Sequence, residues 1–202
     1  MSNALGIDVN HYVYITDVAL ILANNISFVG IKCTEGTTVN DSQFLAHRNL
    51  VRSQPFALVI YYHLARTGDP VAQAHRFLET VGELHANERL ALDTERTSTV
   101  SIQWIDTFYS ELPTDRRHIL YTSAGVWTGM GNPEWSKSET VDLWLPRYGS
   151  AHEPVIPGPW TDYVIWQNSE TGNVPGVSGA CDTNLWNGDI DQLRTYASLV
   201  AS

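Results

Sequence analysis

Hydrophobic residues along the chain occur both in short unbroken runs and in longer stretches where they recur every three or four positions. The short runs are rich in Val, Ile, Leu and Tyr, a composition typical of buried strands. They predict strands at Leu5–Val9, Phe28–Lys32, Ala57–His63, Arg89–Glu95, His118–Thr122, Asp142–Pro146, Tyr163–Gln167 and Ala180–Asp182. The periodic stretches predict helices near residues 16–24, 41–53, 70–85, 99–111 and 189–200.

Two of the predicted helices also have recognisable start signals. Asp69 precedes the helix over 70–85 as a capping residue does, and Pro70 suits its first turn. Asp41 is expected to cap the helix over 41–53 in the same way. The apolar side of the helix over 70–85 consists of Val71, Ala74, Phe77, Leu78, Val81 and Leu84.

Strands that alternate with helices predict parallel strands joined by helical crossovers. Eight strands in 202 residues leave about 25 residues per unit, which is short for an eight-stranded barrel. The second half is richer in Gly and Pro, as in NPEW, EPVIPGPW and NVPGVSG. We therefore predict an α/β fold, a single modified (β/α) barrel of about eight mostly parallel strands with reduced helices in the second half. No repeat or linker divides the chain, so residues 1–202 are expected to form a single domain.

The composition excludes several classes of protein. Twelve basic against 22 acidic residues give a net charge of −10, which argues against a nucleic-acid binder that follows phosphates. No apolar stretch approaches the ~20 residues of a membrane span, so no membrane insertion is expected. Seven Trp and nine Tyr are frequent on carbohydrate-binding surfaces, because flat rings cover the apolar faces of sugars, although such residues also fill ordinary cores.

The sequence gives little support to metal, nucleotide or serine chemistry. The seven His form no ligand motif, no Gly-x-Ser-x-Gly elbow is present, and no glycine-rich loop follows a strand, so neither metal nor cofactor is expected. His63 is expected to be a hydrogen-bonded wall residue rather than a ligand. Cys33 and Cys181 are predicted to be buried thiols, with a disulfide between them left open. Lys32 and Glu35 either reach the mouth of the barrel or simply pair with each other.

Polar and aromatic residues stand where the predicted strands end. In a parallel barrel these ends meet at one mouth, where functional groups collect. The strand-end residues are Asp8, Tyr62, His63, Asp93, Glu95, Tyr121, Trp144, Trp166, Gln167 and Asp182. We therefore expect a polar, ring-lined site at this end of the barrel.

The sharpest local signal is RLALDTE, in which an apolar run leads into Asp93 and Glu95. Their i, i+2 spacing places both side chains on one face of a strand, within roughly 7 Å of each other. Two carboxylates this close raise each other's proton affinity, so one can stay protonated while the other is charged, as glycosidic bond cleavage requires. The alternative is a solvated strand end, and Asp8 and Asp182 at the same mouth favour the catalytic interpretation.

Eight motifs together resemble those of glycoside hydrolase family 25, the lysozymes or N-acetylmuramidases of bacteria, phages and some fungi. In chain order they are LGIDVNHY, FVGIKCTEGT, YYHLART, LALDTE, ILYTS, LWLPRY, VIWQ and GACDTNLWNG. The resemblance extends from about residue 5 to residue 195. It implies a modified β/α barrel that cuts the β-1,4 bond between N-acetylmuramic acid and N-acetylglucosamine in peptidoglycan.

The resemblance also implies roles for individual residues. Glu95 would be the catalytic acid that protonates the leaving oxygen, and Asp93 its carboxylate partner, with Asp8 and Asp182 completing the catalytic group. Two nucleophiles are left open, since either Asp93 or the substrate's own N-acetyl group could attack the sugar. Net retention of configuration and an acidic-to-neutral pH optimum of activity are expected. The substrate-binding residues would be Tyr62, Tyr121, Trp144, Tyr148, Trp166, Gln167 and Asn184.

Two departures from the family pattern are visible. Where relatives usually have a Trp and a Gln-Gly pair after the first strand, this chain reads VYITDVA, which puts the contacts of that loop in doubt. Thr94 replaces a more usual apolar residue between the carboxylates, and is expected to point away from the mouth and to matter little.

Two other functions are weighed against a muramidase. One is a chitinase-like glycosidase, since related barrels also end a strand in Asp-x-Glu, but their longer run of spaced aspartates is absent here. The other is a non-catalytic lectin that binds cell-wall glycan. The expected partner is bacterial peptidoglycan, outside the cell, with the protein acting as a monomer. No secretory signal is visible, which suggests a phage lysin released through membrane holes, or a lost leader.

Overall fold

The computed structural model describes residues 2–95, 100–149 and 153–199. Within these ranges nine strands form one sheet in the order β1-β9-β8-β7-β6-β5-β4-β2-β3, and β1 also pairs with β2. This last pairing closes the sheet into a barrel, with β3 (Val39–Asn40) added outside the ring as a hairpin with β2. The strands of the ring are β1 (Leu5–Val9), β2 (Ile26–Glu35), β4 (Leu58–Leu64), β5 (Glu88–Asp93), β6 (His118–Tyr121), β7 (Val141–Pro146), β8 (Ile165–Gly172) and β9 (Cys181–Trp186).

Most of the ring is parallel, as predicted. From β1 through β2, β4, β5, β6, β7 to β8 every neighbouring pair is parallel. The last strand differs, because β9 is antiparallel to both β8 and β1. The predicted short strand Ala180–Asp182 is thus the beginning of a longer strand that runs away from the mouth.

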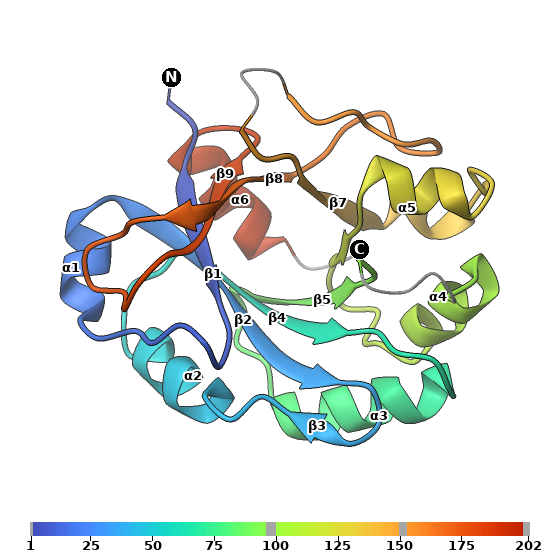
Figure 1. Ribbon diagram of the computed structural model, residues 1–202, viewed down its shortest axis with the longest axis horizontal. Helices are drawn as coiled ribbons and strands as arrows, with labels where there is room; N and C mark the ends of the chain where they lie inside the picture. The colour runs from blue at the N-terminus through green and yellow to red at the C-terminus, as the bar shows by residue number, and fades with distance from the viewer. Residues whose placement is uncertain (1, 96–99, 150–152, 200–202) are drawn as a thin grey trace.

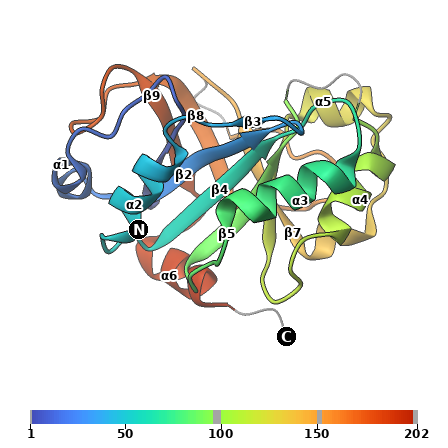
Figure 2. The same cartoon turned by 90° about the horizontal axis from the view of Figure 1, so that it is seen from below.

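Most of the helices lie around the outside of the strands, whereas the last one packs across one end of the barrel (Figure 1). In chain order they are α1 (Val18–Ala23), α2 (Phe44–Arg52), α3 (Pro70–Val81), α4 (Ile102–Ser110), α5 (Ala124–Gly129), the 3₁₀ helix η1 (Ser136–Glu139) and α6 (Ile190–Ser198). The described residues between β7 and β8 contain no helix, which confirms the expected loss of helix in the second half. Figure 2 shows α6 at one end of the barrel, with the arrowheads of β2 and β4 directed toward the other end.

Among the α-helices of the described residues, α2 is the one that does not begin with a capping side chain. Asp69 caps α3 with Pro70 in the first turn, as predicted. Asp41 does not cap α2, whose N-cap is Gln43. Instead, the Asp41 carboxylate accepts hydrogen bonds from the backbone N–H of Gln43 and from both the backbone N–H and the Nδ1 of His11. Asp41 therefore ties the loop after β1 to the residues that precede α2.

The core has two parts because strand residues alternate between the faces of the ring. Val29, Tyr61 and Leu90 pack outward against the helices. Phe28, Ile60 and Ala91 pack inside the barrel with residues of α6. Side chains thus fill the interior of the barrel below its mouth.

Candidate active site

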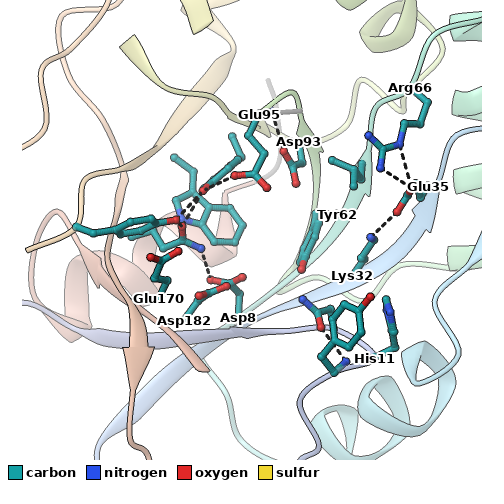
Figure 3. Close-up of a pocket in the computed structure, with 17 residues that line it drawn as sticks. Asp8, His11, Lys32, Glu35, Tyr62, Arg66, Asp93, Glu95, Glu170 and Asp182 are labelled. Carbon is teal, nitrogen blue, oxygen red and sulfur yellow. Dashed lines mark hydrogen bonds and ion pairs between the residues drawn. The ribbon is translucent and has the colours of Figure 1, made fainter. Parts of the chain in front are cut away.

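A cavity of about 450 Å³ opens at the mouth of the barrel. It is lined by nine of the residues singled out in the sequence: Asp8, Tyr62, Asp93, Glu95, Tyr121, Trp144, Tyr148, Gln167 and Asp182. Figure 3 shows the acidic side chains approaching this cavity from opposite sides of the ring. The strand ends therefore meet around one pocket.

Asp8 lies at the floor of the pocket and is 5% exposed. Its Oδ2 accepts hydrogen bonds from Gln167 Nε2 and from Asn184 Nδ2, both at 2.8 Å. Asn184 Oδ1 in turn accepts from the indole N–H of Trp144 at 2.8 Å. Asn184 does not line the pocket, and its amide instead orients Asp8 and Trp144 from behind.

Asp182 faces Asp8 directly across the β1–β9 pair. We expected Asp182 at the end of a strand that points toward the mouth, but it is the second residue of β9, which begins at the mouth and runs away from it. Because β9 is reversed, its beginning lies beside the carboxyl ends of the parallel strands. The Asp182 side chain therefore reaches the same pocket as Asp8, although its strand runs in the opposite direction.

The Asp8–Asp182 pair holds a proton more tightly than ordinary carboxyls do. Burial, followed by the charge of Asp8, raises the pKa of Asp182 to about 8. Burial also raises the pKa of Asp8, against the hydrogen bonds that it accepts from Asn184 and Gln167. Two carboxylates in contact cannot both be charged without cost, so the pair shares one proton at neutral pH.

Asp93 and Glu95 lie on the opposite wall of the pocket (Figure 3). Strand β5 ends at Asp93, so Glu95 belongs to the following turn and not to the strand as predicted. The backbone N–H of Glu95 donates to Asp93 Oδ1 at 3.0 Å, which turns the chain so that both residues still line one cavity. Asp93 is 7% exposed, whereas Glu95 is exposed at the open side of the pocket.

Thr94 is absent from the pocket lining, in line with its expected direction. Its side chain is nevertheless buried, and its hydroxyl donates to the carbonyl oxygen of Tyr121 at 3.1 Å. Thr94 therefore ties the end of β5 to β6, a structural contact that the sequence did not reveal.

Two tyrosines link the carboxylates across the mouth. The hydroxyls of Tyr121 and Tyr148 donate to Gln167 Oε1 at 2.7 and 2.6 Å. The Tyr121 hydroxyl also lies 3.4 Å from Glu95 Oε2. Since the amide group of Gln167 reaches Asp8, a continuous polar network connects Glu95 with Asp8.

Trp144 forms an aromatic wall with its neighbours in the barrel. Tyr62 and Tyr121 meet its ring edge to face, at centroid distances of 6.2 and 5.2 Å. Gly30 makes this possible, because a Cβ there would lie 2.8 Å from both Asp8 Cβ and Trp144 Cη2. Trp166 does not join the wall, since it packs outside the ring with the cluster around Leu143, Leu145 and Tyr163.

The pocket has further lining residues that sequence reasoning missed or left open. Lys32 and Glu35 fulfil both of their predicted alternatives, since they line the pocket and form a 2.7 Å ion pair. His11, Arg66 and Glu170 were not singled out for the site, although they also line it. Arg66 comes shortly after the end of β4, and Glu170 lies within β8 shortly after Gln167, so closeness to the predicted strand ends is the signal that could have found them.

Other candidate groups are structural. His63 is buried, hydrogen-bonds Thr34 and Gln73, and burial lowers its pKa to about 4. It was expected in the wall of the mouth but does not line the pocket, because its ring packs against Phe77 and Phe108 on the outer side of β4. Cys33 and Cys181 are buried free thiols. Over the described ranges, no group of three or more His, Cys, Asp or Glu side chains is placed to hold a metal ion. No helix in the same ranges is long and apolar enough to cross a membrane.

A closed barrel with paired carboxylates and aromatic walls at its mouth is the architecture of a glycoside hydrolase. Comparison with known proteins specifies the family, because the family described as glycosyl hydrolases family 25 matches residues 7–177. The chain therefore belongs to glycosyl hydrolases family 25 and is an enzyme of that class.

Individual relatives agree with this assignment. Lysozyme M1 of Streptomyces globisporus is 31% identical over 99% of this chain and 73% of its own. An N,O-diacetylmuramidase of Arthroderma benhamiae is 28% identical over 95% of this chain and 86% of its own. The crystal structure of a bacterial lysozyme from Streptomyces coelicolor superimposes with a TM-score of 0.88 at 28% identity, covering 98% of both chains.

Proposed function

We propose that this enzyme is a lysozyme that hydrolyses the β-1,4 bond between N-acetylmuramic acid and N-acetylglucosamine in bacterial peptidoglycan. The observation that carries the proposal is the meeting of Asp8, Asp93, Glu95 and Asp182 in one aromatic-walled pocket. The names of the relatives, lysozyme and N,O-diacetylmuramidase, supply the substrate class.

In the proposed reaction Glu95 donates a proton to the leaving glycosidic oxygen. Its carboxyl group stands at the open side of the pocket, where a bound glycan can reach it. Asp93 is more deeply buried, and its negative charge stabilises the positive charge that develops on the sugar ring. The reaction proceeds with net retention, through either direct attack by Asp93 or attack by the N-acetyl group that Asp93 orients.

Asp8 and Asp182 bind the sugar, and the proton that they share is not the one donated to the leaving group. Their shared proton lets the pair both donate to and accept from sugar hydroxyls. Tyr62, Tyr121 and Trp144 form the apolar wall against which a sugar ring packs, and Tyr148 stands at the rim. The buried Trp144 is therefore a better candidate for a sugar contact than the outer Trp166.

The proposed substrate places the enzyme at the bacterial wall, outside the membrane. The chemistry described requires no metal or organic cofactor, since carboxyl groups perform both the acid and the electrostatic roles. It also requires one chain only, because all the residues named belong to a single barrel mouth.

The products of digestion test the bond that is cut. Purified peptidoglycan is digested, the new reducing ends are reduced with borohydride, and the fragments are analysed by mass spectrometry. We expect reduced muramic acid at the new ends. Reduced glucosamine would instead show a glucosaminidase and would contradict the proposal, as would turnover confined to chitin oligomers.

A further inference from the structure

A positively charged corner of the pocket lies apart from the carboxylates described above. Figure 3 shows Lys32, Glu35 and Arg66 on the opposite side of Tyr62 from Asp8 and Asp182. Lys32 Nζ donates to Glu35 Oε2 at 2.7 Å, and Arg66 donates from Nε and Nη2 to Glu35 Oε1 at 2.9 and 2.7 Å. Two cations thus surround one carboxylate, and this corner has a net charge of +1.

Glu35 is charged at neutral pH. Its partial burial would raise its pKa, but the hydrogen bonds from Lys32 and Arg66 outweigh burial and hold the pKa below its usual value. Both Glu35 oxygens are therefore occupied by cations. A guanidinium has five N–H donors, and Glu35 accepts from only two nitrogens of Arg66, so the group has donors to spare for a second acceptor.

Arg66 is held in place by surrounding residues. Its backbone N–H donates to Gln73 Oε1 at 3.1 Å, and its carbonyl oxygen accepts from Gln73 Nε2 at 2.8 Å, with Gln73 fully buried. Gly36 has a φ of +55°, and a Cβ there would lie 3.3 Å from Arg66 Cβ and Cγ. The Arg66 side chain is 38% exposed over the pocket, so a preorganised cation faces the substrate.

The expected substrate provides an anion for this corner. Muramic acid differs from glucosamine by a lactyl ether on O3, which ends in a carboxylate or, when a peptide is attached, in an amide leading to peptide carboxylates. At the other end of the pocket, Asp8, Asp93, Glu95, Glu170 and Asp182 repel such groups. A guanidinium pairs with carboxylates through two parallel hydrogen bonds, and such charge-assisted bonds are strong.

We propose that Arg66, supported by Lys32 and Glu35, forms a subsite for the carboxylate-bearing substituent of muramic acid. This inference rests on the proposed function and deepens it, since it states how the enzyme distinguishes muramic acid from glucosamine. Arg66 binds the substrate carboxylate, and Glu35 fixes the direction of the guanidinium.

Three forms of one glycan test the subsite. The first is peptidoglycan with intact peptide stems, and the second is amidase-treated glycan with free lactyl carboxylates. The third is the same amidase-treated glycan after its lactyl carboxylates have been converted to methylamides. The variants are Arg66→Gln, which removes the charge, and Arg66→Lys, which keeps it. Arg194→Gln on the exposed face of α6 is the matched control.

For Arg66→Gln we expect kcat/KM to fall about tenfold or more on a carboxylate-bearing glycan and less than twofold on the methylamide, mainly through KM. Arg66→Lys recovers part of the loss, and Arg194→Gln changes none of the three substrates. A loss on amidase-treated glycan identifies the lactyl carboxylate as the ligand, and a loss on intact peptidoglycan alone identifies the peptide stem.

An equal loss by Arg66→Gln on all three substrates, or no loss on any, overturns the subsite. In both cases cleavage by the wild-type enzyme would still uphold the muramidase assignment. Failure of the wild-type enzyme to release muramic acid ends from any of the three glycans would instead refute the proposed function itself.

Discussion

The carboxyl groups of Asp8 and Asp182 illustrate how much is decided at the scale of single residues. The sequence directs attention to Asp93 and Glu95 as the pair that raises proton affinity, because they are two positions apart. The structure shows the clear carboxyl–carboxyl contact between Asp8 and Asp182, which are far apart in the chain and paired across two strands. The raised pKa values of Asp8 and Asp182 therefore arise from burial and from a pairing that only the tertiary structure creates.

A pH dependence of stability follows from this pair. The pKa of Asp182 is about 8 in the folded protein and 3.8 in its unperturbed state, so the folded protein keeps a proton that the unfolded chain releases. This contribution to stability is complete below about pH 4, declines as pH rises from there to about 8, and is absent above. Urea unfolding at pH 4 to 9 should show this decline for the wild type.

Asp182→Asn removes the titrating group and should flatten the decline between pH 4 and 8, because an amide resembles the protonated acid. Asp191→Asn, on the exposed face of α6, is the control and should leave the wild-type slope unchanged. If the free energy of unfolding changes with pH in the same way for wild type and for Asp182→Asn, then Asp8 and Asp182 do not hold an extra proton in the folded protein.

At the scale of elements, the glycine in β2 shows how a strand provides space for the site. Gly30 pairs with Asp8 on one side and with Ile60 on the other, so its position inside the ring is fixed. Asp8 and Trp144 occupy the volume that a side chain at residue 30 would fill. The pocket floor depends on this close approach of strands β1, β2 and β7.

Gly30→Ala should impair both activity and stability. The added methyl group would lie 2.8 Å from Asp8 Cβ and Trp144 Cη2, and overpacking of this kind costs about 1–3 kcal/mol. We expect a lower melting temperature and a loss of kcat/KM on peptidoglycan. Gly129→Ala in α5, where a Cβ meets no atom within 4 Å, is the control. Equal behaviour of the two variants would contradict the packing argument.

At the scale of the whole molecule, the two ends of the barrel have separate tasks. The mouth holds the acidic pocket, whereas α6 packs at the other end (Figure 2). Arg89, only 1% exposed, donates from Nη2 to the carbonyl oxygens of Tyr196, Ala197 and Leu199 and so caps the last turn of α6. Stability can therefore be changed at this end without touching the site.

Arg89→Met keeps much of the side-chain volume and removes these hydrogen bonds. Because hydrogen bonds to a charged group contribute about 1.5–3 kcal/mol, we expect the free energy of unfolding to fall by about that amount. At a temperature where both proteins are folded, kcat/KM should stay within twofold of wild type. An unchanged unfolding free energy, or a selective loss of activity, would contradict the separation of the two ends.

Much of this architecture could be predicted from the sequence, for physical reasons. Buried parallel strands are continuous apolar runs, so their ends, and with them Asp8, Asp93 and Tyr121, were visible. The direction of β9 could not be predicted, because the sequence around Asp182 does not specify which strands β9 pairs with. Trp166 was expected in the site but faces outward, since a shift of one position along a strand reverses the face. Arg66 lies in the segment after β4, where sequence periodicity gives no direction, and Glu170 lies in the part of β8 beyond the predicted strand end at Gln167.

The net charge of −10 also matters for the whole molecule. Bacterial walls rich in anionic polymers do not attract such a protein by long-range electrostatics. Within this chain, the proposed recognition of the substrate rests on short-range contacts in the pocket, where the positively charged corner around Arg66 and the aromatic wall around Trp144 are placed.

The most direct test of the account is the turnover of purified peptidoglycan by Glu95→Gln, compared with Glu79→Gln on the exposed side of α3. The amide keeps the shape of Glu95 but has no acidic proton to donate, and the loss of a general acid lowers rates by about 10²–10⁴. For Glu95→Gln the account predicts a fall of at least 10² in kcat/KM with an unchanged melting temperature. For the control Glu79→Gln it predicts wild-type activity. Activity of Glu95→Gln within about tenfold of wild type would contradict it.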